Sequence, residues 1–131
     1  MSDFFQNGGI TTLHNLSTRS LEQMEDDLLR FSKKRPMGLI LPSLYSELQR
    51  PALTTIVEEL KNVNYLNQVV IGIDQANRDE FKQALGFFSC LPQQHDLLWN
   101  HGPNLLAIDE ILRKEGLAPT EQGKGRNVWY C

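Results

Sequence analysis

Two short apolar runs, separated by an amphipathic segment, constrain the fold of this chain more than any other feature. The first, "MGLILP" at residues 37–42, is closed by a proline, and the second, "VVIGID" at residues 69–74, ends in an acid. Continuous apolar runs of this length suit strands that are buried on both faces of a sheet. The segment "PALTTIVEELKNV" lies between them and places four apolar residues on one helical face: Leu53, Ile56, Val57 and Leu60. Together the three segments predict a βαβ unit.

The alternation of strands and helices continues to the end of the chain. "RDEFKQALGFFSCL" has the pattern of a helix, "HDLLWN" that of a third short strand, and "NLLAIDEILRKEG" that of a helix ending at Gly116. The sequence therefore predicts an α/β fold of three layers, with a mostly parallel sheet flanked by helices and right-handed crossovers. We expect residues 1–18 to form an irregular arm and residues 19–131 a single nucleotide-binding α/β domain, which opens with an amphipathic helix built on "SLEQMEDDLLRFSKK".

Composition excludes several classes of function. With 131 residues, 40% of them hydrophobic, the chain is long enough for one core, and its net charge of −3 gives no general attraction for nucleic acid. Its apolar runs are too short to span a membrane and its N-terminus lacks the features of a secretory signal, so a cytoplasmic protein without membrane contact is expected. Cys90 and Cys131 form no CxxC motif, and we interpret both as reduced thiols.

The segment after the first predicted strand is the first candidate for a ligand site, because ligands of such folds bind at the carboxyl ends of the strands. In "LPSLYSEL", Pro42, Ser43 and Leu44 leave the strand and offer backbone groups, and Glu47 supplies a carboxylate. A simple turn and helix cap explains Pro42 and Ser43 equally well.

Asp74, at the tip of the second predicted strand, is the second candidate. A carboxylate in this place can accept a hydrogen bond from a ribose hydroxyl or a base N–H, but it could equally cap a helix that starts near Asn77. Because consecutive βα loops of neighbouring parallel strands open on the same side, we expect Asp74 and residues 42–47 to lie together at the carboxyl edge of the sheet.

The third candidate is "GKG" at residues 123–125. Its two glycines allow the backbone to approach an anion closely, and Lys124 supplies a positive charge suited to a diphosphate. An exposed flexible turn is the alternative interpretation, because the chain has neither a Walker A loop nor a GxGxxG motif.

Other kinds of chemistry find little support in the sequence, and the catalytic residues stay unknown. His14, His95 and His101 lie far apart without ligand spacing, so no metal site is predicted from them. No GxSxG motif marks a nucleophilic serine.

Taken together, "LILPSLYSEL", "VVIGID" and "EQGKGRNVWYC" resemble the family-2-type glycosyltransferases of GT-A fold, and among them the glucosyl- and mannosyl-3-phosphoglycerate synthases. The resemblance implies that a nucleoside pocket is lined by Pro42, Ser43, Leu44 and Glu47. It also implies that Asp74 faces the base or ribose and that Lys124 contacts the diphosphate. The chain departs from the family pattern in "YSE", where two adjacent acids are usual, and in "DQAN", which replaces "DSGSTD".

The same resemblance implies a longer enzyme. Such enzymes bind Mg²⁺ or Mn²⁺ through an Asp-any-Asp motif on a later strand, and this chain has no such motif. We therefore expect the N-terminal half of a hexosyltransferase, truncated at its C-terminal end and inactive alone. The expected partners are a nucleoside diphosphate sugar, a small phosphorylated acceptor such as 3-phosphoglycerate, and a second copy in a homodimer.

Two other classes of function stay open from the sequence. A non-enzymatic α/β interaction module could use its exposed final helix to pair with a partner or with itself. A nucleotidylyltransferase-like enzyme is the other alternative, although the glycine-rich basic loop expected after its first strand is missing from "PSLYSEL".

Overall fold

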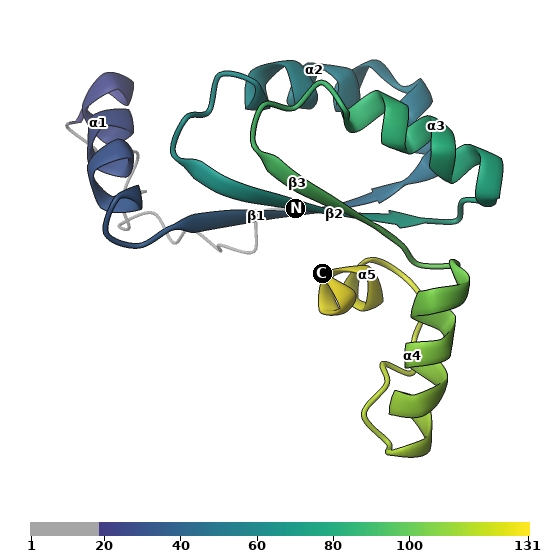
Figure 1. Ribbon diagram of the computed structural model, residues 1–131. Coiled ribbons are helices and arrows are strands. Elements are labelled where there is room, and N and C mark those ends of the chain that lie inside the picture. The colour runs from purple at the N-terminus through teal and green to yellow at the C-terminus, as the bar shows by residue number, and fades with distance from the viewer. Residues whose placement is uncertain (1–18) are drawn as a thin grey trace, which may run out of the picture.

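A computed structural model describes residues 19–131 of the chain, and it has the predicted α/β architecture. Its sheet has the strands β1 (Met37–Leu44), β2 (Leu66–Asp74) and β3 (Gln94–Trp99), which are parallel and lie in the order β1-β2-β3 (Figure 1). The predicted βαβ unit and the third strand are thus confirmed.

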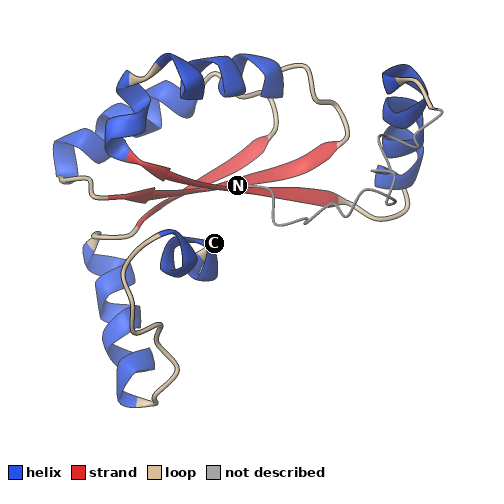
Figure 2. Cartoon of the chain, turned by 180° about the vertical axis from the view of Figure 1, so that it is seen from behind, coloured by secondary structure: helices blue, strands red, loops and turns tan. Residues whose placement is uncertain are grey.

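Helices lie on both sides of the sheet. α2 (Pro51–Leu60) and α3 (Arg78–Phe88) cover one face, whereas α4 (Pro103–Lys114) and α5 (Lys124–Tyr130) lie on the opposite side (Figure 2). The short α5 packs beneath β1 and β2. These helices and the sheet give the expected three layers.

The core lies between the sheet and the layer of α2 and α3. Val69, Ile71 and Ile73 of the central strand are fully buried, and they pack with Val57 of α2 and Phe88 of α3. Burial of this continuous apolar surface is the main driving force for folding of the domain.

Two expectations about burial were wrong. β1 is not buried on both faces, because Ile40 lies on the face opposite the core and is 44% exposed there. Ile56 was expected on the buried face of its helix with Leu53 and Val57, yet it is 46% exposed. In this ten-residue helix, Leu53, Val57 and Leu60 are the buried residues, and Ile56 falls outside the stripe that reaches the sheet.

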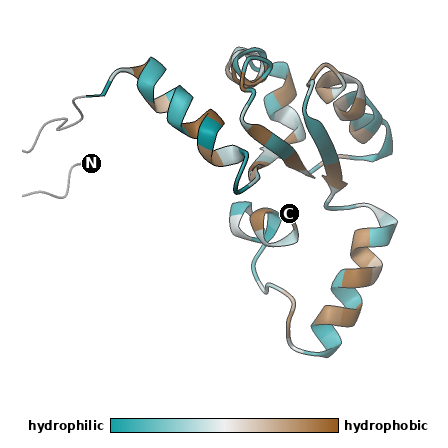
Figure 3. Cartoon of the chain, turned by 60° about the vertical axis from the view of Figure 1, so that its left-hand side comes forward, coloured by the Kyte–Doolittle hydropathy of each residue, from teal (hydrophilic) through white to brown (hydrophobic). Residues whose placement is uncertain are grey.

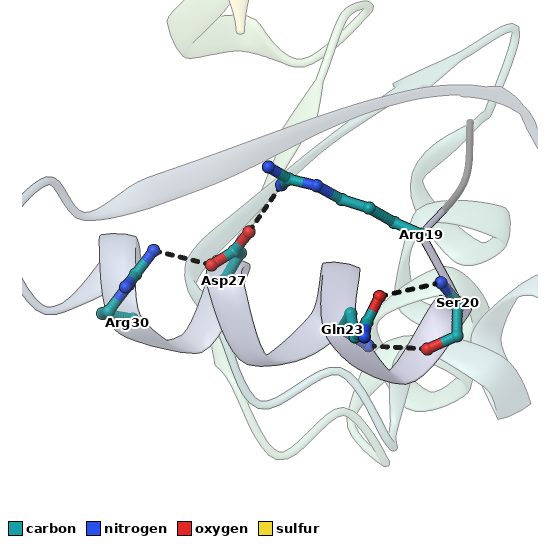
Figure 4. Close-up of polar contacts among 5 residues, drawn as sticks. All are labelled: Arg19, Ser20, Gln23, Asp27 and Arg30. Atoms are coloured by element: carbon teal, nitrogen blue, oxygen red, sulfur yellow. Dashed lines mark hydrogen bonds and ion pairs between the residues drawn. The ribbon is translucent and has the colours of Figure 1, made fainter. Parts of the chain in front are cut away.

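α1 (Leu21–Ser32) forms as predicted but lies to one side of the sheet with no buried residue. Local contacts hold it: Ser20 and Gln23 cap its start reciprocally, and Asp27 pairs with Arg19 and Arg30 (Figure 4). A capping box satisfies backbone groups that would otherwise lack partners, whereas exposed ion pairs contribute about 0–1 kcal/mol each.

α4 also projects from the sheet, and its surface is unusual. Apolar (brown) segments recur along this helix as well as on the strands (Figure 3). The buried residue of α4 is nevertheless the acid Asp109, whereas Ile108 and Ile111 are exposed. Within residues 19–131, no helix has the length and apolar character needed to cross a bilayer.

Candidate functional site

A pocket of about 280 Å³ opens at the carboxyl ends of β1 and β2, beside the first turn of α5. All six residues selected from the sequence line it. The complete lining is Pro42, Ser43, Leu44, Glu47, Asp74, Gln75, Gly123, Lys124 and Asn127. Three stretches that are far apart in the sequence therefore meet at one place, although their role in binding a nucleotide stays a prediction.

The register of the sheet explains why the first two stretches meet. Ser43 is paired with Ile73 and Leu44 with Asp74, so β1 and β2 end at the same level. The predicted placement of Asp74 and residues 42–47 at one carboxyl edge is confirmed.

Asp74 is held at the base of this pocket with one carboxylate oxygen engaged. Its Oδ1 accepts a hydrogen bond from the Gln75 N–H at 2.9 Å and lies 3.3 Å from Nδ1 of His101. Its other oxygen, Oδ2, makes no hydrogen bond with residues 19–131. The side chain is 10% exposed and lines the pocket, so this oxygen is free to accept a hydrogen bond from a ligand.

The capping role considered for Asp74 is wrong. The cap of α3 is Asn77, whose side-chain oxygen accepts from the N–H groups of Asp79 and Glu80 at 3.0 Å each. Glu80 returns a hydrogen bond by accepting from the Asn77 N–H at 2.7 Å. This capping box satisfies the free backbone N–H groups at the start of α3, so Asp74 is not required as the cap of this helix.

Glu47, by contrast, has a local structural role. Its Oε2 accepts from the Leu44 N–H at 2.9 Å and closes the turn into the short 3₁₀ helix η1 (Tyr45–Gln49). The turn-and-cap interpretation of Pro42 and Ser43 is wrong, because β1 continues to Leu44 and both residues are paired with β2. The capping contact of this segment comes from Glu47. Its carboxylate still lines the pocket, where it adds negative charge.

Gln75 is a pocket residue that the sequence did not reveal. Its φ of 53° places it in the left-handed region, where a non-glycine residue costs about 1–2 kcal/mol. The hydrogen bond from its N–H to Asp74 holds this sharp turn. Such strain is found preferentially at functional positions, which supports this edge as the working end of the sheet.

α5 supplies the third wall of the pocket. Asn127 is 2% exposed, and its Nδ2 donates to the Gly72 carbonyl oxygen at 2.9 Å, which fastens α5 to β2. Lys124 begins the helix on the same side, is exposed, and makes no ion pair with any carboxylate of residues 19–131. Its ammonium group is thus free to meet an anionic ligand.

A second polar cluster holds α5 against α4. Arg126 and Tyr130 of α5 both contact Oδ1 of Asp109, the arginine at 3.3 Å, and Arg113 contacts Oδ2 at 2.6 Å. The hydrogen bond from Tyr130, followed by those from the two arginines, lowers the pKa of Asp109 to about 2, although burial opposes this shift. Burial and the adjacent carboxylate raise the pKa of Tyr130.

This cluster predicts how α5 responds to acid. A depressed carboxyl pKa stabilises the folded state fully above the ordinary value near 3.8, and the contribution is lost as the pH falls toward about 2. We expect the hydrogen-exchange protection factors of residues 124–131 to fall between pH 4 and pH 2, before those of β2 change. If α5 and β2 lost protection at the same pH, the titration of Asp109 would not control the release of α5. In Asp109→Asn, which has no carboxyl group at this position, the separate acid transition of α5 should be absent.

The part of the chain that the structure describes contains no group of three or more histidine, cysteine, aspartate or glutamate side chains able to hold a metal ion. In the pocket, Glu47 and Asp74 are each engaged in a hydrogen bond to the backbone. We assign no ligand of the expected Mg²⁺ or Mn²⁺ among these residues.

Comparison with curated proteins found two clear relatives. The chain is 43% identical to glucosyl-3-phosphoglycerate synthase of Persephonella marina over 129 residues, and 33% identical to that of Methanococcoides burtonii over 130 residues. The chain matches a fragment of this enzyme. Each alignment covers 98% of the chain but 32% of the relative, so the chain spans about a third of the length of these relatives.

These relatives confirm the resemblance inferred from the sequence motifs. No family model matches the chain, and no solved structure matches it either.

Proposed function

We propose that this chain is the nucleotide-sugar-binding part of a glycosyltransferase that transfers glucose, or the related hexose mannose, to 3-phosphoglycerate or a similar small acceptor. One observation carries the proposal. The pocket brings together a carboxylate oxygen of Asp74, the end of β1 and Lys124, which has no ion pair within residues 19–131, in a chain that is similar over 98% of its length to two glucosyl-3-phosphoglycerate synthases.

The chemistry of the lining residues suits the parts of a nucleoside diphosphate. The free Oδ2 of Asp74 accepts from a ribose hydroxyl or a base N–H, both of which are donors. Residues 42–44 are the last residues of β1, are paired with Gly72, Ile73 and Asp74 of β2, and line the pocket at the end of the strand. Lys124 places a positive charge across the pocket, where the diphosphate would lie.

The pocket also suggests that the complete reaction uses separate sites for the donor, the metal ion and the acceptor. Departure of a nucleoside diphosphate develops negative charge that one exposed lysine neutralises poorly and a divalent cation neutralises well. Residues 19–131 contain no group of three or more histidine, cysteine, aspartate or glutamate side chains that could hold a metal ion. We therefore propose that this pocket binds the donor, and that the ligands of Mg²⁺ or Mn²⁺ and the acceptor site are formed by residues other than these. The cytoplasm, where such phosphorylated substrates occur, is the proposed compartment.

A binding screen tests the function directly. UDP-, GDP- and ADP-linked glucose and mannose are titrated into the chain by calorimetry, with the free nucleosides as controls. At least one sugar nucleotide is expected to bind, and to bind more tightly than its nucleoside. Absence of binding by every donor would overturn the proposal.

Asp74→Asn should weaken nucleotide binding while leaving stability almost unchanged. Asparagine keeps an oxygen that can accept from the Gln75 N–H, but it replaces the free carboxylate oxygen by a donor. We expect a loss of about 1.5–3 kcal/mol of binding, the range for a hydrogen bond to a charged group, and a stability change within about 0.5 kcal/mol.

Calorimetry and thermal melting measure the two effects of Asp74→Asn. Asp79→Asn is the matched control, because the Asp79 side chain is 84% exposed and lies outside the pocket lining. A large loss of stability with normal affinity would instead assign Asp74 a structural role.

Self-association is a further part of the proposal. One edge of β1 pairs with no strand in residues 19–131, and unpaired edges invite a second chain. Apolar side chains also stay exposed on α4 and α5, with Ile111 62% and Trp129 52% exposed. We expect light scattering to show a homodimer. A monomer at high concentration would contradict this expectation and weaken the alternative of an interaction module as well.

A further inference from the structure

Asp109 joins the two helices that lie on the side of the sheet opposite α2 and α3. It is the buried residue of α4, and its side chain is only 6% exposed. Two of its partners, Arg126 and Tyr130, come from α5, and the third, Arg113, lies one turn later on its own helix. Arg126 is itself 9% exposed and lies over the Tyr130 ring, with its guanidinium carbon 5.2 Å from the centroid. The cluster is therefore a built contact and not a surface ion pair.

The cluster and the pocket use different sides of α5. Arg126 and Tyr130 are four residues apart, which places both on the helix face toward Asp109. Lys124 and Asn127 are three residues apart and line the pocket together. Asn127 fastens this second face to the Gly72 carbonyl of β2. Two attachments on two faces fix the rotation of α5 about its axis, and hence the direction in which Lys124 projects.

α5 depends on these attachments for its place. A helix of seven residues is too short to be stable in isolation, because the cost of nucleation is not recovered. Removal of the carboxylate would leave the nearly buried Arg126 without a counter-charge. The free-energy cost of such an unpaired buried charge is larger than the net stabilisation that the ion pair provides. The contact with Asp109 therefore strongly favours one position of α5.

We propose that Asp109 is a positioning residue of the nucleotide site: through Arg126 and Tyr130 it sets the place of Lys124 beside the pocket. This inference rests on the proposed function, in which Lys124 contacts the diphosphate. Asp109 is absent from the lining of the pocket, so its effect on binding passes through α5.

Asp109→Asn tests this role because asparagine preserves the size of the side chain and removes its charge. Affinity for the nucleoside diphosphate that binds best is expected to fall about tenfold, the order of one charged contact, while affinity for the nucleoside changes little. Combined with Lys124→Ala, it should add almost nothing, because both changes remove the same interaction. Without ligand, hydrogen exchange in residues 123–131 should accelerate. Glu110→Gln is the matched control, because Glu110 is the next residue of α4 and its side chain is 69% exposed.

The outcomes separate this inference from the proposed function. Equal losses for nucleoside and diphosphate, or losses that add fully to those of Lys124→Ala, would overturn the positioning role. If the unsubstituted chain binds no nucleotide, the proposed function fails. If, in addition, hydrogen exchange of residues 123–131 is unchanged in Asp109→Asn, the positioning role of Asp109 is overturned as well. Should Asp109→Asn fail to fold, Tyr130→Phe replaces it, because this variant keeps both arginines on the carboxylate. Tyr130→Phe should give a smaller loss of the same selectivity, and no loss would contradict the inference.

Discussion

Gly72→Ala is expected to displace α5 from the sheet and to remove most of the affinity for a nucleoside diphosphate. A Cβ atom at residue 72 would lie 1.8 Å from Oδ1 of Asn127 and 2.8 Å from Sγ of Cys131. Atoms do not approach so closely, so the side chain of Asn127 in α5 and that of Cys131, which follows the helix, must move. Lys124, which begins the same helix, would move with them.

The cost of this movement follows from the hydrogen bond that Asn127 makes. Its amide cannot turn away from the new methyl group and still donate to the Gly72 carbonyl at 2.9 Å. A buried side-chain amide left without its acceptor costs about 1–3 kcal/mol, and overpacking costs typically about 1–3 kcal/mol more. The sum of these costs exceeds the intrinsic stability of a seven-residue helix, because such a short helix is not stable without packing. We therefore expect α5 to move away from the sheet.

Hydrogen exchange and calorimetry on the same variant measure both effects. The matched control is Gly38→Ala, another strand glycine, whose added Cβ would meet nothing closer than the Gln68 carbonyl oxygen at 3.7 Å. Fast exchange in residues 124–131 with a protected β2 is expected for Gly72→Ala alone. Normal affinity in a variant with displaced α5 would show that this helix has no part in the site.

Lys124→Ala is expected to cost about 1.5–3 kcal/mol of binding to a nucleoside diphosphate, the range for a hydrogen bond to a charged group. This corresponds to a loss of affinity of about tenfold to 150-fold. The loss should be much smaller for the nucleoside, which carries no phosphate. Folding should be unaffected, because Lys124 is exposed and has no ion pair within residues 19–131.

Titration of a nucleoside, its monophosphate and its diphosphate against the variant isolates the contribution of the charge. Lys82→Ala serves as the control, because Lys82 is 63% exposed on α3 and lies outside the pocket lining. Equal losses for all three ligands would mean that Lys124 supports the shape of the pocket and does not contact the phosphates.

The strands and helices were largely predictable because their signals are local. The apolar run at residues 69–74 marked the buried half of β2, and helical spacing marked α2 to α4. The first residues of β2 were missed, because polar Gln68 gives no strand signal. It is ordered by pairing across the sheet, where its side chain donates to Asp96 at 2.6 Å. Cross-strand partners of this kind cannot be read from one segment.

The candidate site was predictable only where topology alone decides position. Parallel strands end at one edge, so Asp74 and residues 42–47 had to meet, whatever the details of packing. The fastening of α5 could not be foreseen, because Gly72 and Asn127 are 55 residues apart and either residue alone is unremarkable. The same holds for Asp109, which the helical pattern of α4 marks only as a polar position, and for His101 beside Asp74.

Amide-resolved NMR of the chain during titration with UDP-, GDP- and ADP-glucose tests the account most directly. If the pocket at the strand ends binds the donor, the perturbed amides will cluster at residues 42–47, 74–75 and 123–127, the segments that contain its lining residues. They should saturate together with one of the three donors. Perturbations confined to other parts of the domain, or none with any donor, would contradict the assignment of this pocket as the nucleotide site.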